Sequence, residues 1–263
     1  IGGIATGRWQ GALAGAAIGA VVGGAGGYLA ALQRQSQDQA VLYRNVRSDM
    51  ERENLEIDRS QAAFNQLLDC RYNSAQRIRT AYRQGRLDRA TAQAQLREVQ
   101  ARMRNDVALA QTISERIRTR GAEFDTALDA IQPGARAAAA GARISQPVPA
   151  RPLSASIDLK LRPDPRAPSV GALVTRENVQ VRPATGGFVL VEAPGGLRGY
   201  APASQFSAQG VDLRRASASP PPASGTQDAR QLAASNIIRR ENFQQTVEHA
   251  QQVAAGPGFE LAS

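Results

Sequence analysis

The chain has one cysteine and one histidine among its 263 residues, Cys70 and His249. A lone cysteine excludes an internal disulfide and a paired-cysteine metal or redox motif, and a lone histidine excludes a multi-histidine metal site. A Cys–His nucleophile pair would have to join two distant predicted elements. We therefore expect no enzyme, no metal and no cofactor. Cys70 is expected as a small buried residue on a helix, and His249 as a surface residue near a helix C-terminus, where positive charge is favourable.

Aromatic residues and lysine are also scarce. Aromatic side chains make up 5% of the chain, which is little material for one large core, so we expect elongated helices and one small compact module. Lys160 is the one lysine, and arginine therefore carries nearly all of the positive charge behind the net charge of +9. Arginine and acidic residues alternate through the middle of the chain without a concentrated phosphate-binding stripe. Nucleic acid is not the expected partner.

Charged residues are absent from Trp9 to Gln33, where glycine recurs at every fourth position. Each glycine costs a helix about 1 kcal/mol relative to alanine, so a regular series of glycines needs a compensating contact. The spacing places them on one helix face, where a second backbone can approach closely, as in membrane helices. The predicted helix-packing residues are Gly7, Gly11, Gly15, Gly19, Gly23 and Gly27. Trp9 and Tyr28 bracket the segment as membrane-interface residues do.

This segment, residues 1–32, is therefore expected to be a membrane or oligomerisation helix. The alternative is a flexible tail rich in glycine and alanine. The glycine series resembles the glycine-zipper segments of bacterial envelope proteins and lipoproteins. The resemblance implies close helix packing and does not imply one particular activity.

Residues 33–132 predict a long antiparallel helical hairpin. Apolar residues recur at steps of three, four and seven along both arms, as in the seam of a coiled coil. Between the arms, Gly85 suits a left-handed C-terminal cap of the first helix, and Asp88 suits the N-terminal cap of the second. Gly121 interrupts the second arm and is expected to weaken it.

Two segments rich in alanine and proline, residues 133–152 and 209–225, are expected to be linkers between independently moving parts. A final helix is expected over residues 226–255, and packing within the assembly is its expected role. Residues 256–263 form a tail. Between the two linkers, residues 153–208 change to the short alternating pattern of β-strands, with turn residues between them.

About five short strands in residues 153–208 suggest a small barrel. In order, the segments "LKLRPDP", "SVGALV", "ENVQVRP", "FVLV" and "RGYAPASQF" resemble the strands of a bacterial SH3 domain. The resemblance implies a binding module that commonly recognises peptidoglycan or peptide in the cell envelope. Phe188, where that family usually carries tryptophan, and Tyr200 are the candidate ligand residues. The alternative is that both rings belong to the core.

The expected fold is mainly α, with a glycine-zipper helix, a long antiparallel hairpin or coiled coil, and a small all-β SH3-like barrel. The expected function is a non-catalytic scaffold subunit of a bacterial cell-envelope assembly, associated with the membrane and mostly periplasmic. The expected partners are further copies of the chain, membrane lipid, and other envelope proteins or peptidoglycan. Two alternatives stay open: a ring- or pore-forming membrane component lined by the glycine helices, and a wall-targeting accessory of a separate hydrolase.

Overall fold

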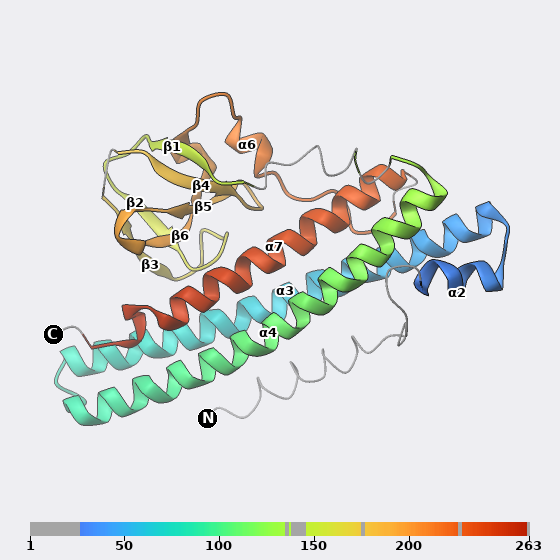
Figure 1. Ribbon diagram of the computed structural model, residues 1–263. Helices are drawn as coiled ribbons and strands as arrows, with labels where there is room; N and C mark the ends of the chain where they lie inside the picture. Colours follow the sequence, from blue (N-terminus) through green and yellow to red (C-terminus); the bar gives the residue numbers. More distant parts are fainter. Residues whose placement is uncertain (1–26, 135–136, 138–145, 175–176, 226–227, 262–263) are drawn as a thin grey trace. The chain divides into compact units, whose positions relative to one another are not determined.

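The computed structural model describes residues 27–134, 137, 146–174, 177–225 and 228–261. The described part is mostly helical and carries an antiparallel sheet toward its C-terminal side, as the sequence predicts at this coarse level (Figure 1). Its helices are α2 (Gly27–Gln35), α3 (Gln39–Arg83), α4 (Arg89–Ile131), α6 (Leu213–Ala216) and α7 (Ala229–Ala255). Its strands are β1 (Val148–Pro152), β2 (Ile157–Lys160), β3 (Ser169–Leu173), β4 (Val179–Pro183), β5 (Phe188–Glu192), β6 (Arg198–Pro202) and β7 (Phe206–Ser207).

These elements belong to two compact units, and α3, α4 and α7 contribute residues to both. The first unit takes the described residues of Ile1–Ala63, Thr112–Arg143 and Pro220–Gln244. The second unit takes the described residues of Phe64–Gln111, Ile144–Ser219 and Gln245–Ser263.

The connection between α3 and α4 has the caps that its sequence predicts. Gly85 adopts a φ of 69°, a conformation that favours glycine, and its N–H donates to the Tyr82 carbonyl at 2.9 Å. The Asp88 carboxylate accepts a hydrogen bond from the Thr91 backbone N–H at 2.9 Å and another from the Thr91 hydroxyl. These hydrogen bonds hold the pKa of Asp88 below its usual value. Local chemistry therefore ends one helix and begins the next.

The core of the first unit is formed by four helices. Residues on one face of α2, α3, α4 and α7 pack together: Tyr28, Leu32, Leu42, Val46, Met50, Phe124, Ala127, Leu128, Leu232 and Ala233. The Tyr28 ring meets the Phe124 ring edge-on at 5.3 Å between centroids, and its hydroxyl donates to Asp49 at 2.8 Å. A second polar contact joins α3 to α4: Arg120 Nε on α4 lies 2.8 Å from a carboxylate oxygen of Glu53 on α3.

Gly121 gives α4 a notch for a side chain of α7. Arg240 Nη2 lies 3.0 Å from both carboxylate oxygens of Asp125, and these two side chains are only 14% and 12% exposed. A Cβ atom on residue 121 would lie 1.6 Å from Arg240 Nη1. The expectation that Gly121 merely weakens the helix was therefore incomplete: its bare backbone is what lets the arginine cross α4 to reach the aspartate.

The second unit carries a seven-stranded antiparallel sheet in the order β3-β2-β6-β5-β4-β1-β7. The five predicted strands appear as β2 to β6. The strand order is that of an open sheet, so the closed SH3-like barrel stays a prediction. One face holds the main core of the unit, to which β5 contributes Val189 and Val191. The other face of β5 carries Phe188 and Leu190, so this strand is buried on both sides.

Two stretches that were expected to be linkers contain regular structure. The first ends in β1, which pairs with β4 through Val148–Ala150 and with β7 through Arg151–Pro152. Proline lacks a backbone N–H, and a strand that changes partner part-way tolerates it better than a central strand does. The second contains α6, whose N-terminal cap is Asp212, with Oδ1 accepting from the N–H groups of Arg214 and Arg215 at 3.1 Å. The composition of these segments concealed both elements.

Gly121→Ala should destabilise the protein by about 1–2 kcal/mol, because the new methyl group displaces Arg240 from a largely buried ion pair. In a helix interior the same change would otherwise stabilise by about 1 kcal/mol. The effect should therefore reverse its sign in an Arg240→Ala background, where the side chain ends at Cβ and leaves the notch empty. Urea unfolding of the four proteins in this cycle measures both values. Destabilisation of equal size in the two backgrounds would show that the notch has no bearing on Arg240.

Candidate functional site

The two predicted ligand residues lie together on one face of the sheet. Phe188 on β5 and Tyr200 on β6 form a buried cluster with Ala184 and Leu190, and Leu190 is paired directly with Tyr200. Phe188 is 7% exposed and Tyr200 only 1%. The prediction of two surface aromatics for a ligand was wrong, and the alternative that both rings belong to the core is correct. A helix covers the face on which they lie.

That helix is α7, whose C-terminal turns contact the sheet within the second unit. The His249 ring meets the Tyr200 ring edge-on, with 5.2 Å between centroids and planes at 90°. Gln245 Nε2 donates to the Pro183 carbonyl at 3.5 Å, and the Glu248 carboxylate lies 3.5 Å from Arg182 Nη1. Helix contacts therefore reach both β4 and β6.

His249 is enclosed at this contact and was wrongly expected at the surface. Its side chain is 1% exposed, and neither ring nitrogen has a hydrogen-bond partner among the described residues. Burial, and secondarily the positive charge of Arg198, lower the pKa of His249 to about 3. The contact consequently holds a neutral imidazole. Burial also raises the pKa of the Tyr200 phenol, which stays protonated beside Thr246.

The sheet is also attached to α3 within the second unit. Arg162, in the loop after β2, lies with its Nε 3.1 and 3.0 Å from the two carboxylate oxygens of Asp69 on α3. The same guanidinium contacts Asp164 at 2.6 Å. Two residues further along α3, Arg71 Nε lies 2.7 Å from a carboxylate oxygen of Asp106 on α4, and each of these side chains is 11% exposed. Largely buried arginine–carboxylate pairs thus fix this part of the chain.

The other predicted site residues divide into two groups. Those that lie outside the described residues are Gly7, Gly11, Gly15, Gly19, Gly23 and Trp9. Gly27 is the first residue of α2, and Tyr28, expected at a membrane interface, is instead 8% exposed within the core of the first unit. Its ring packs on Phe124 because α2 lies against the hairpin helices.

Cys70 is exposed on α3, and the expectation of a buried thiol was wrong. Within the described ranges, histidine, cysteine and acidic side chains do not gather in groups of three or more that could hold a metal ion. Among the helices that the structure describes, none has both the length and the apolar character needed to cross a membrane.

The contribution of α7 is what the sequence analysis missed. Its apolar residues follow one face only loosely, since the helix packs against other elements on several sides. The spacing of Gln245, Thr246 and His249 could have indicated a buried face. Residues 245 and 249 are four apart and residues 246 and 249 are three apart, so all three lie on one side of a helix. These three residues are polar, and polar side chains are usually exposed, so the sequence did not suggest that this face is buried.

Comparisons with models of protein families, with curated proteins and with solved structures give no match to this chain.

The buried imidazole should make stability depend on pH. The unfolded chain takes up a proton near pH 6.5, whereas the folded chain resists it down to about pH 3, so the stabilisation is complete above pH 6.5 and declines below it. Between pH 7 and pH 5 the free energy of unfolding should fall by about 2 kcal/mol. His249→Phe, which keeps an aromatic ring against Tyr200, should remove this loss. His249 is the one histidine, so an equal loss in the variant would assign the pH dependence to other groups.

Proposed function

We propose that this chain is a non-catalytic scaffold subunit of a bacterial cell-envelope assembly. Its glycine-spaced segment would pack against copies of itself or a neighbouring helix in or at a membrane. The helical hairpin would act as a spacer, and the small β module would contact peptidoglycan or a protein partner. The bulk of the chain would lie in the periplasm.

The observation that carries this proposal is the firm attachment of the sheet within the second unit. The sheet contacts α7 through His249 and Gln245, and it contacts α3 through Arg162. A module on a flexible tether samples many positions, whereas one fixed by buried contacts on two helices keeps a defined position on them. Holding a module in place on a helical support is a structural task, and it suits a spacer.

The burial of Phe188 and Tyr200 restricts how the β module would bind a partner. The Tyr200 ring packs against His249 of α7 and Phe188 is buried in the same cluster, so the ligand contact would use another surface of the module. Two large apolar side chains remain exposed there, Leu153 at 62% and Val174 at 75%. The likeness to bacterial SH3 domains therefore supports a binding role without supplying its residues.

Replacing Gly15 and Gly19 together by leucine should abolish assembly, because the added side chains prevent close approach of two helix backbones. Light scattering on the full chain extracted in detergent measures the mass of the particle. The matched control is Ala17→Leu with Val21→Leu, which adds leucines to the opposite face of the same helix and should keep the native mass.

A native mass in the glycine variant would contradict the proposal that these glycines form the oligomer. Circular dichroism should show an unchanged helical content in both variants, since α3 and α4 are built by their own caps and core. A closed oligomer of many copies, lost only in the glycine variant, would favour the ring or pore alternative over a simple anchor.

A further inference from the structure

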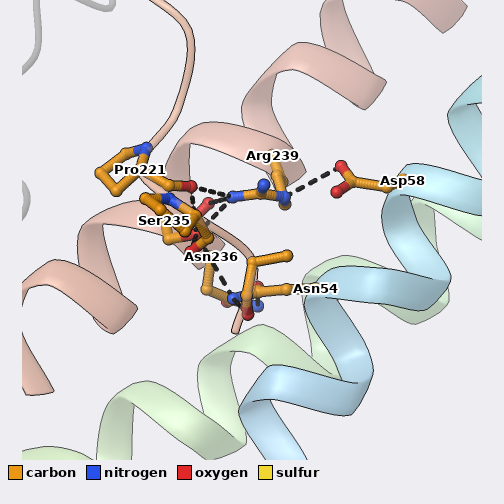
Figure 2. A network of polar contacts seen from close by, with 8 residues as sticks. Asn54, Asp58, Pro221, Ser235, Asn236 and Arg239 are labelled. Atoms are coloured by element: carbon orange, nitrogen blue, oxygen red, sulfur yellow. Dashed lines mark hydrogen bonds and ion pairs between the residues drawn. The ribbon is translucent and has the colours of Figure 1, made fainter. Parts of the chain in front are cut away.

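Polar side chains of α3 and α7 in the first unit are almost wholly buried beside residues 221–223, and the site that these side chains form is called the cleft. Asn54 and Ser235 are 0% exposed, Asn236 is 1% exposed, and Arg239 is 8% exposed. Such groups are costly to bury unless they form hydrogen bonds. Figure 2 shows their hydrogen bonds, which reach Asp58 on α3 and Pro221 in the segment before α7.

The cleft presents donors to the consecutive backbone carbonyls of Pro221, Pro222 and Ala223, which precede α7. Arg239 Nη1 donates to the Pro221 carbonyl at 2.9 Å. The Ser235 hydroxyl lies 3.1 Å from the Pro221 carbonyl and 3.0 Å from the Pro222 carbonyl. Asn54 Nδ2 donates to the Ala223 carbonyl at 3.2 Å. Three side chains from two helices thus contact three successive carbonyls.

A second set of contacts orients these donors. Arg239 Nε donates to Asp58 at 2.9 Å on the side away from Pro221, as Figure 2 shows. Asn236 Nδ2 donates to the Asn54 side-chain carbonyl at 2.8 Å, which directs the Asn54 amide nitrogen toward the strand. Just beyond the carbonyls, the Gly225 N–H donates to Glu51 at 3.2 Å. Asn236 and Asp58 thus orient Asn54 and Arg239 through contacts that do not involve residues 221–223.

This arrangement matches the chemistry of a proline-rich strand. Proline has no backbone N–H, so a run of prolines can be bound through its carbonyls and offers no donor in return. Prolines also favour an extended conformation in advance, which reduces the entropy lost on binding. Asn54, Ser235 and Arg239 all act as donors here, as such a ligand requires.

We propose that this cleft is a binding site for a proline-rich strand, filled in the structure by the chain's own Pro221–Ala223, and that it accepts the same segment from a second copy. An emptied cleft would leave buried donors without acceptors, so a strand supplied in trans restores the bonds that the cis strand makes. An identical chain carries the matching segment. This proposal is independent of the glycine helices and of a membrane.

The test uses the full chain with Pro220–Ser224 replaced by a glycine–serine linker of about twice that length. A fluorescent peptide of residues 218–225, ASPPPASG, should bind this variant at least tenfold more tightly than the unaltered chain, whose cleft is already filled. A peptide with alanine in place of its three prolines should bind weakly. Ser235→Ala in the linker variant should weaken binding by about fivefold, as expected for the loss of one hydrogen bond. Ser74→Ala in the same linker variant is the control and should leave the affinity unchanged.

A folded linker variant that does not bind the peptide, or that binds the alanine peptide equally well, would overturn the proposal. If the linker variant does not fold, the proposal is tested instead by amide hydrogen exchange in the chain that keeps its own residues 220–224. Ser235→Ala should then speed exchange of the Gly225 amide at least tenfold, because the strand leaves Glu51 when its carbonyls lose their donor. Unchanged exchange at Gly225 would show that the cleft does not hold the strand.

Discussion

Burying a polar side chain costs free energy unless the side chain forms hydrogen bonds, and α7 carries buried polar side chains along much of its length. In the first unit, Arg239 contacts Asp58 on α3 and Arg240 contacts Asp125 on α4. In the second unit, Gln245 donates to the carbonyl of Pro183 on β4 at 3.5 Å, and Glu248 lies 3.5 Å from Arg182. Hydrogen bonds and ion pairs are directional, so within each unit these contacts favour one register of α7 against its neighbours.

The sequence allowed prediction of the parts that depend on local chemistry. A glycine in a left-handed conformation and an aspartate at a helix start act on their immediate neighbours, and the turn between α3 and α4 was predicted from Gly85 and Asp88. The strands β2 to β6 were predicted in the same way, from alternation over a few residues. The strand β1 was missed because prolines are common in linkers, and only its long-range pairing with β4 and β7 makes it a strand.

The candidate site was predicted less well, because burial is decided by elements distant in sequence. Nothing near Tyr200 indicates that a helix some fifty residues later lies over it, and nothing near Gly121 indicates the arrival of Arg240. The same reason explains Tyr28. Its position in the sequence fits a membrane interface, but in the fold its ring packs against Phe124 of α4. A residue type indicates what a side chain can do, whereas its partners decide which of these it does.

The burial of β5 on both faces has a consequence for folding while the protein is being synthesised on the ribosome. The last strand of the sheet ends at residue 207, yet the α7 residues that contact the sheet and Tyr200 begin only at Gln245. During this interval of translation an apolar face stays uncovered on the nascent chain, and such surfaces are prone to aggregate. Covering this face therefore belongs to the last stage of synthesis, when the final turns of α7 become available to the sheet.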